Sequence, residues 1–287
     1  MPDNYLTVDV EEYFEEAPPE VAARCPSRLE AQMDRLLALL DETGSRATFF
    51  FLARRAEAFP SLVRRVASLG HEVACHGLDH VYLYRFQPAE RLEQVERALD
   101  TVRRAAGGPV VGFRAPYFSL DRSCAEIFPR LAELGVRYDS SLFPGWHPFY
   151  GFRGIPSHPF RLEIGGDGGG ILELPPTVAD LGLFRVGVGS GGYLRMFPFS
   201  LTMRALRSIA RRRPLVLYFH PWELDPDQPR LRLDMRFPFR HYANLRSTEE
   251  RLRRILSSFD FRPCRDALER DWPALPLSRL FRTPNPL

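Results

Sequence analysis

The sequence predicts an α/β fold in which helices cover a mostly parallel sheet. Short β-branched or aromatic runs alternate with amphipathic runs at least four times before residue 141, and this alternation is typical of strand-helix units. The 287 residues and the 45% hydrophobic content suit one large domain. These observations favour either an open doubly wound sheet or a barrel.

The expected elements follow from hydrophobic periodicity and from glycine and proline stops. The expected strands are 5–10, 47–53, 71–77, 110–116, 136–141 and 214–220, and the expected helices are 28–42, 59–70, 88–106, 121–135, 199–212 and 247–259. Residues 143–192 are rich in aromatic residues, proline and glycine, and we expect loops and short strands there. The clusters GGDGGG and GVGSGG lack a following Gly-Lys-Ser/Thr, so neither predicts a phosphate-binding loop.

Composition excludes several functional classes. The 39 basic and 36 acidic residues leave a net charge of only +3, so nucleic acid is not an expected partner. The four cysteines form no C-x-x-C pair, which argues against a disulfide framework or a thiolate zinc site. The N-terminus has no secretory signal, and no run reaches the roughly 18 apolar residues of a membrane span. We expect a cytoplasmic protein, with peripheral attachment to the inner membrane as an alternative.

Polar side chains follow the carboxyl ends of five expected strands. Parallel α/β folds gather their chemistry at this end of the sheet. If the strands are parallel, these side chains converge on one site. They are Asp9 and Glu11, His76 and His80, Arg114, Asp139, and His220.

The segment HEVACHGLDH, residues 71–80, contains a candidate pair of metal ligands. His76 and His80 are four residues apart, and on a helical turn their Cβ atoms would lie about 5 to 6 Å apart, close enough to bind one ion. A carboxylate from the first strand end would supply a third ligand. The alternative is a chance spacing without metal. His71 is expected only to start its strand.

The run VDVEEYF supplies the carboxylates. In an extended strand Asp9 and Glu11 point to one side and Val10 to the other. One carboxylate could bind a metal while the other accepts a proton from water. The alternative, a solvated acidic strand end, is the expectation for Glu12, Glu15 and Glu16.

Two further strand ends carry candidate catalytic groups. Arg114 lies between apolar residues and needs a carboxylate partner. After it, Pro116 and Tyr117 would fix a loop whose Tyr117 N–H could face an oxyanion. His220 ends a hydrophobic strand and suits a general acid, with Trp222 as an apolar wall; a structural histidine is the alternative.

Five ordered motifs resemble one known family. Asp9 with Glu11, then HGLDH, RAPY, YDSS and YFHPWE resemble the motifs of the polysaccharide deacetylase superfamily, carbohydrate esterase family 4. The DVE and HPWE motifs are most similar to a branch associated with bacterial exopolysaccharide assembly. The resemblance covers about residues 5 to 265 and implies a distorted (β/α)7 barrel. Residues 1–287 would form one catalytic domain, with the C-terminal helix and Pro-rich tail of about residues 240–287 packed on it.

The resemblance also implies an activity: metal-dependent removal of N-acetyl groups from amino sugars of a bacterial polysaccharide or its precursor. It implies Asp9 as general base, Arg114 as the residue that orients it, and His220 as general acid with Asp139 as its partner. The implied metal ligands are Glu11, His76 and His80. One departure is Val10, which stands where the common motif has a second aspartate. Zinc is the expected metal, and cobalt or nickel would also fit.

Two alternatives remain open. One is an amidase that acts on a small cyclic or formyl amide, because relatives with that chemistry share the barrel. The other is a carbohydrate-binding relative without catalysis, in which Trp146, Phe149, Tyr150 and Trp222 stack on sugar rings. A deacetylase and a carbohydrate-binding relative would both have a carbohydrate as their partner, whereas an amidase would not. The sequence indicates no oligomeric state.

Overall fold

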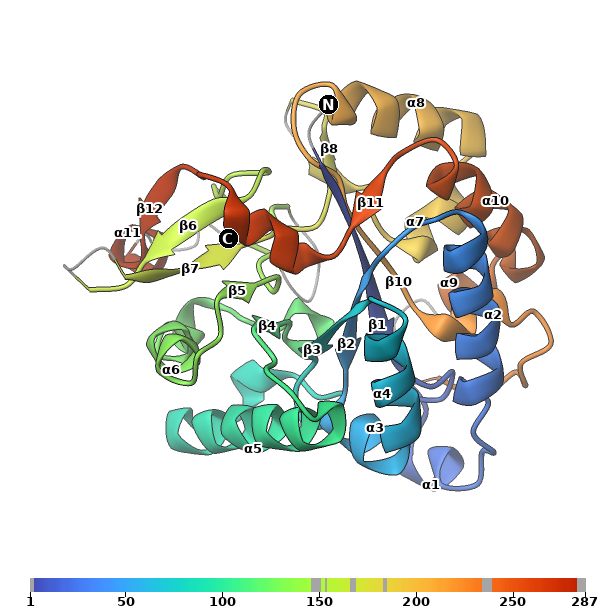
Figure 1. Ribbon diagram of the computed structural model, residues 1–287, viewed down its shortest axis with the longest axis horizontal. Helices are drawn as coiled ribbons and strands as arrows, with labels where there is room; N and C mark the ends of the chain where they lie inside the picture. Colours follow the sequence, from blue (N-terminus) through green and yellow to red (C-terminus); the bar gives the residue numbers. More distant parts are fainter. Residues whose placement is uncertain are drawn as a thin grey trace.

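The computed structural model describes residues 3–145, 151–152, 154–165, 169–182, 185–233 and 239–282. Strands and helices alternate along the first half of the chain (Figure 1). The strands are β1 (Asn4–Val10), β2 (Thr48–Phe51), β3 (Glu72–Cys75), β4 (Gly112–Phe113), β5 (Tyr138–Asp139), β6 (Phe160–Glu163), β7 (Gly170–Glu173), β8 (Val178–Asp180), β9 (Arg185–Gly187), β10 (Val216–Phe219), β11 (Phe261–Arg262) and β12 (Ala274–Pro276). The helices are α1 (Pro19–Ala22), α2 (Leu29–Glu42), α3 (Ala53–Ala58), α4 (Pro60–Ser68), α5 (Pro88–Ala106), α6 (Ile127–Glu133), α7 (Gly191–Met196), α8 (Phe199–Ala210), α9 (Phe239–Tyr242), α10 (Thr248–Leu256) and α11 (Leu277–Arg282).

The strands form a distorted barrel. Seven of them run parallel in the order β10-β1-β2-β3-β4-β5-β7, and β6 and β12 extend the sheet beyond β7. The two ends of the parallel row meet at Thr177, whose N–H donates to the Val216 carbonyl at 3.0 Å. The Val216 N–H donates back to the Thr177 hydroxyl at 2.7 Å. The predicted α/β class with a mostly parallel sheet is confirmed.

The two faces of β1 explain the division of the core. Leu6, Val8 and Val10 face the helices and pack in the main hydrophobic cluster. Tyr5 faces the barrel interior, in a second cluster with residues of the other strands. All seven residues of β1 are buried, as expected for a central parallel strand. The same inward face ends in Asp9.

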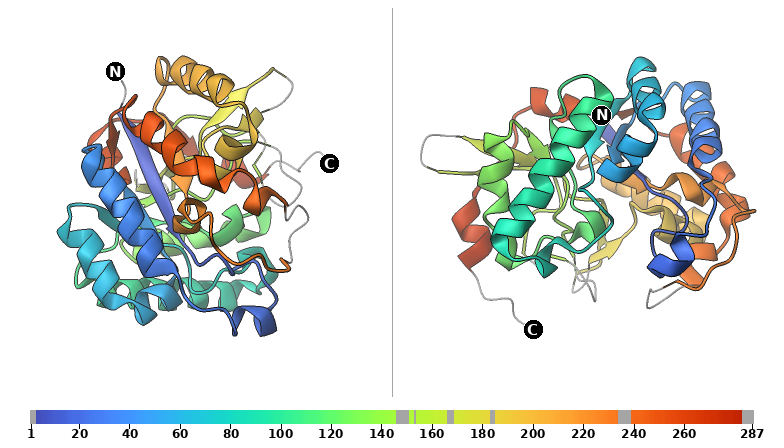
Figure 2. Two further views of the ribbon diagram at one scale, coloured as in Figure 1. Left: turned by 90° about the vertical axis from the view of Figure 1, so that its right-hand side faces the viewer. Right: turned by 90° about the horizontal axis from the view of Figure 1, so that it is seen from below.

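Helices α2 to α6 cover the outer side of the sheet (Figure 2). Proline occupies the first turn of α4 and of α5, where its missing N–H costs no hydrogen bond. Gly107 ends α5 in the left-handed region at φ 68°, and its N–H donates to the Arg103 carbonyl. No described helix is long and apolar enough to cross a membrane.

Three elements are shorter than the sequence predicts. The strand expected at 110–116 is β4 alone, since the chain leaves the sheet at Arg114. The strand expected at 136–141 is β5 alone. The helix expected at 121–135 starts as a 3₁₀ turn at Arg122–Cys124, and its regular part is α6.

Candidate active site

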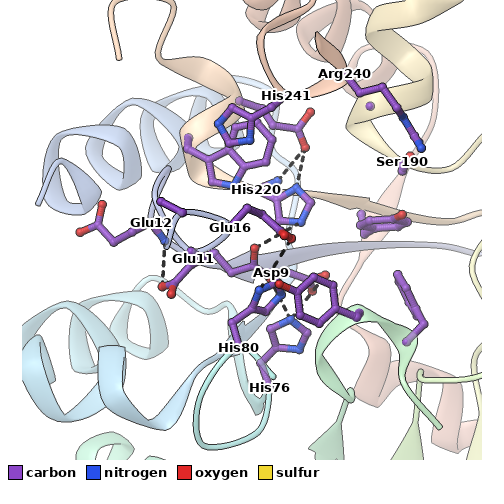
Figure 3. Close-up of a pocket in the computed structure, with 18 of the residues that line it drawn as sticks. Asp9, Glu11, Glu12, Glu16, His76, His80, Ser190, His220, Arg240 and His241 are labelled. Carbon is purple, nitrogen blue, oxygen red and sulfur yellow. Dashed lines mark hydrogen bonds and ion pairs between the residues drawn. The ribbon is translucent and has the colours of Figure 1, made fainter. Parts of the chain in front are cut away.

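A cavity of about 600 Å³ opens at the carboxyl ends of β1, β3 and β10 (Figure 3). The predicted residues Asp9, Glu11, His76, His80 and His220 all line it. The convergence follows from the fold, because parallel strands bring segments that are far apart in sequence to one edge of the sheet. Aromatic residues form much of the remaining wall. They are Tyr82, Tyr117, Phe118, Tyr218, Trp222 and His241.

Glu11 lies at the centre of a three-residue cluster. The Nε2 atoms of His76 and His80 each lie 3.0 Å from its Oε1. All three side chains are at most a few per cent exposed. Burial acts to raise the pKa of Glu11, but the neighbouring His80 and His220 charges and the histidine hydrogen bonds hold it well below its usual range. One carboxylate and two imidazole nitrogens that point at a common centre fit a divalent cation.

The orientation of His76 supports this fit. Its Nδ1 lies 2.9 Å from the Arg114 carbonyl oxygen, which can only accept, so Nδ1 carries the proton. In the neutral ring Nε2 then presents a lone pair to Glu11. Two acceptors that face each other at 3.0 Å require a cation between them, either a proton or a metal.

The segment that carries both histidines is not helical, although their four-residue spacing is typical of a helical turn. Residues 76–77 have no regular structure, residues 78–81 form a bend, and Gly77 has φ +85°. A Cβ at Gly77 would also lie 3.0 Å from the Pro116 ring. The rings of His76 and His80 still converge, with centroids 5.9 Å apart. The glycine therefore brings together two motifs that are far apart in sequence.

Asp9 and Arg114 form a buried ion pair. Nη1 of Arg114 lies 2.7 Å from Oδ1 of Asp9, and the guanidinium has no exposed surface. The same Nη1 donates to the Thr7 hydroxyl, and Nη2 donates to the Ser140 hydroxyl. These bonds fix the Asp9 carboxylate, whose Oδ2 lies 4.0 Å from Nε2 of His76. Arg114 is thus placed to orient Asp9.

Asp139 does not partner His220, so that expectation is wrong. Its carboxylate accepts hydrogen bonds from the hydroxyl and the N–H of Ser141, and it lies beside Glu173 on the adjacent strand. Burial raises the pKa of both Asp139 and Glu173. Because Ser141 also binds the Ala115 N–H and Ser140 binds Arg114, the YDSS motif supports the arginine loop instead.

The partner of His220 is Glu223. Oε1 of Glu223 lies 2.8 Å from Nδ1 of His220, and Oε2 accepts from Nε of Arg195 at 2.9 Å. On the other side of the ring, Nε2 of His220 lies 3.7 Å from Oε2 of Glu11. The histidine therefore bridges the Glu11 cluster and a fully buried Glu223–Arg195 pair.

Tyr117 and Trp222 both line the cavity, as expected. Tyr117 has φ 57°, an unusual backbone conformation for a residue with a side chain, and such strain clusters at functional sites. Its ring lies between those of His80 and Tyr82, with centroid distances of 4.0 and 4.1 Å. Trp222 stacks between His220 and His241 and forms an apolar wall.

The acidic residues after Glu11 are not a solvated strand end. Glu12 is 1% exposed and binds Ser27 and the Arg28 N–H, and Glu15 pairs with Arg55. Glu16 lines the cavity, with Oε1 4.0 Å from Nδ1 of His80. The aromatic residues Trp146, Phe149 and Tyr150, considered for sugar stacking, lie outside the described residues.

Sequence reasoning missed Glu223, Arg195 and Glu16. The sequence did contain a signal for Glu223, which lies three residues after His220 in a short helical turn. At this spacing a side chain can reach back to the residue that starts the turn. Arg195 and Glu16 had no such local signal, since their partners are distant in sequence.

Comparisons with known proteins agree with this architecture. Residues 14–138 match the model of the polysaccharide deacetylase family, and residues 140–269 match one described as a domain of unknown function, DUF3473. Among solved structures, a candidate polysaccharide deacetylase of Mycobacterium smegmatis has a TM-score of 0.63 at 20% identity and covers 95% of this chain and 93% of its own. An allantoinase, PuuE, has a TM-score of 0.60 at 17% identity, and the match covers 93% of this chain and 89% of the allantoinase. Both likenesses concern the fold.

Curated relatives include several carbohydrate deacetylases. A peptidoglycan deacetylase-like protein of Gibberella zeae is 29% identical over 110 residues, 38% of this chain and 32% of its own length. The peptidoglycan-N-acetylglucosamine deacetylase of Bacillus cereus is 32% identical over 83 residues, 29% and 30% of the two lengths. The matched part thus spans about a third of these relatives. The chain thus shares its α/β fold with these solved structures, and part of its sequence is similar to carbohydrate deacetylases. The polysaccharide deacetylase model matches residues 14–138, which is less than half of the chain.

Proposed function

We propose that this protein is a metal-dependent hydrolase that removes N-acetyl groups from amino sugars of a bacterial polysaccharide or its precursor, in the exopolysaccharide-associated branch, with the described chain as one catalytic unit. The observation that carries the proposal is that Asp9 and His220 both lie beside the Glu11–His76–His80 cluster, and that side-chain atoms of Asp9, Glu11 and His220 lie within 4.8 Å of one another. A binding module needs neither a fixed carboxylate nor a fixed imidazole at that position. The cavity also exceeds the needs of a small cyclic amide.

In this proposal Glu11, His76 and His80 hold a divalent cation, with zinc as the first choice. The bound cation would supply positive charge that acidifies water and polarises a carbonyl. Asp9, held by Arg114, accepts the proton of the attacking water. The N–H of Tyr117 donates to the developing oxyanion.

His220 completes the reaction in this proposal. Its Nδ1–H donates to Glu223, so the ring is held with Nε2 toward the cavity. A proton on Nε2 can then pass to the leaving amine nitrogen, which departs poorly as an anion. The stacked rings of Trp222 and His241 form a wall on which a sugar face can pack.

The test is acetate release from N-acetylglucosamine oligomers by metal-loaded protein, with allantoin and formamide-type substrates as comparisons. We expect turnover of the oligomers, and a loss on the order of 10²-fold or more in kcat for His220→Asn or Asp9→Asn. Turnover of the small amides alone would assign the amidase activity instead. Zinc binding and oligosaccharide binding without acetate release would mark a non-catalytic relative.

A further inference from the structure

The outer face of α8 carries an unusual combination of charge and apolar surface. Met196, Phe197 and Leu201 are three of the six large hydrophobic residues that are exposed in the described chain, and Leu201 is 60% exposed. Four exposed arginines follow on the same helix and its C-terminal turn. We define the α8 face as the surface formed by Phe197, Leu201, Arg204, Arg207, Arg211 and Arg212.

Leu201 and the four arginines share one side of the helix, and at 100° per residue they fall within a sector of about 140°. Phe197 lies just before the helix, at the end of α7. The opposite side holds the buried Thr202, Met203, Leu206 and Ala210. The face is therefore free for a partner, and α8 lies at the outer edge of the molecule (Figure 1 and the left view of Figure 2).

The arginines of the α8 face lie together, and carboxylate partners for them are missing from the described residues. On other helices several arginines pair with carboxylates, as Arg35 does with Glu249 and Arg130 with Glu96 and Glu133. Within the described part of the chain, none of the four α8 guanidinium groups has a carboxylate within 4.0 Å. The sequence from 181 to 222 contains no acidic residue at all. This face thus has an uncompensated charge of four, on a protein whose net charge is only +3.

The exposed apolar residues are held in place by the fold. Nη1 of Arg251 donates to the carbonyls of Leu194 and Phe197, which fixes the chain between α7 and α8. The ring of Phe197 stacks on Tyr193 at 5.7 Å. A fixed, exposed aromatic ring beside cations suits insertion at a lipid surface, where apolar side chains enter the acyl boundary and arginines meet phosphates.

From these observations we propose that the α8 face docks this protein on an anionic membrane surface. Charge complementarity identifies the lipid as anionic, and Phe197 and Leu201 favour a membrane over a soluble polyanion, which would gain nothing from them. The face begins at the rim of the active-site cavity, since Ser190 and Gly192 line the cavity and Tyr193 touches Phe197. Docking would keep the cavity close to saccharides held at that surface. The proposal does not depend on the catalytic assignment.

The test is co-sedimentation with phosphatidylcholine vesicles, with and without phosphatidylglycerol. Wild-type protein should bind only the anionic vesicles, and less at high salt. The variant R204Q/R207Q/R211Q/R212Q should bind more weakly by about fivefold for each arginine, on the order of 10²- to 10³-fold in all. The matched control R64Q/R97Q/R104Q/R137Q removes the same charge from exposed positions on another face and should bind nearly as wild type. Leu201→Ser should weaken binding several-fold, and Leu69→Ser should not.

Several outcomes would overturn the proposal. Equal binding by the four-arginine variant and its control would show that net charge, and not this face, is responsible. Retention on soluble heparin without vesicle binding, unaffected by Leu201→Ser, would assign the face to a polyanion. All variants should keep wild-type circular dichroism and wild-type turnover of a soluble oligosaccharide, which separates a failure of docking from a failure of the proposed function.

Discussion

Glu223 holds His220 at two points. Its Oε1 lies 2.8 Å from the ring Nδ1 and 3.1 Å from the backbone nitrogen of His220. Burial alone would lower the pKa of His220, but the charges of Glu11 and Glu223 and the hydrogen bond outweigh it and raise the pKa to about 9. Because Arg195 fixes the other oxygen of Glu223, the direction of the imidazole is set by a pair of buried residues, while its charge is favoured by Glu11 as well as by Glu223.

Removing the charge of Glu223 should therefore impair turnover more than substrate binding. For Glu223→Gln we expect kcat to fall on the order of 10- to 10²-fold with little change in KM, because a support for a reacting group is lost. Acetylated chitooligosaccharides are suitable substrates. The control is Glu249→Gln, which removes an exposed partner of Arg35. An unchanged kcat in folded Glu223→Gln would contradict the positioning role.

Glu11 should control metal content. Glu11→Gln keeps the size of the side chain but removes its charge. Loss of a group that only supports a metal ligand typically weakens metal binding roughly 10- to 100-fold. We expect Glu11→Gln to weaken zinc binding by more than this. Glu16→Gln, in the same cavity but outside the cluster, should have a smaller effect. Zinc per chain after dialysis and titration calorimetry measure both. Equal zinc affinity in Glu11→Gln and wild type would remove Glu11 from the ligand set.

The Asp9–Arg114 pair should show strong coupling in a double-mutant cycle. Arg114→Met leaves a buried carboxylate unpaired and should lower the free energy of unfolding by about 3 to 5 kcal/mol. Asp9→Asn combined with Arg114→Met should cost less than the sum of the single changes, with a coupling of about 0.5 to 3 kcal/mol. Urea unfolding provides the measurement, and Arg130→Met, which breaks a surface pair, should lower the free energy of unfolding far less than Arg114→Met does. Additive changes would mean that the two side chains do not interact.

Two adjacent glycines in α7 should respond differently to alanine. A Cβ at Gly191 would clash with the Glu223 carboxylate, whereas the nearest atom to a Cβ at Gly192 is 3.9 Å away. We expect Gly191→Ala to lower stability by about 1 to 3 kcal/mol through overpacking. Gly192→Ala should be neutral or stabilising by up to about 1 kcal/mol, since alanine favours helix. Thermal unfolding of the two variants compares them directly, and equal melting temperatures would refute the close packing at Gly191.

His71 should make the fold sensitive to acid. Burial and the charge of Arg46 lower its pKa to about 4, and its Nδ1 accepts from the Ala47 N–H at 3.3 Å. The unfolded chain, with a histidine pKa near 6.5, therefore binds more protons, and stability falls as pH drops from about 6.5 to 4. Between pH 7 and pH 5, protonation linked to His71 should lower the free energy of unfolding by about 2 kcal/mol. In urea unfolding, the stability of His71→Gln should fall correspondingly less than that of the wild type over this pH range. An equal fall in stability in both proteins would mean that other groups cause the acid sensitivity.

Much of the site could be predicted from the sequence, because strand geometry fixes it. The alternation in β1 requires Asp9 and Glu11 to face one way and Val10 the other, and a parallel sheet requires the strand ends to meet. Both requirements are local or topological. They need no knowledge of side-chain contacts.

The partner of His220 could not be obtained in this way. Asp139 and Glu223 both follow strands, and only the loop conformations decide which carboxylate reaches the ring. Asp139 is already satisfied by Ser141, two residues away, whereas Glu223 folds back within its own turn. Similarly, the spacing of His76 and His80 suggests a helical turn, and the positive φ of Gly77 produces the same convergence with a different backbone.

The order of strands in the barrel has a consequence for how this polypeptide can be divided. The boundary between the two family matches, at residues 138 and 140, falls inside β5. Strands that follow this junction flank those that precede it on both sides, β7 beside β5 and β10 beside β1. Cutting the gene at this junction would leave each fragment with unsatisfied backbone edges and half of a hydrophobic interior, so insertions, tags or split reporters belong in the surface loops and not at the junction of the two matches.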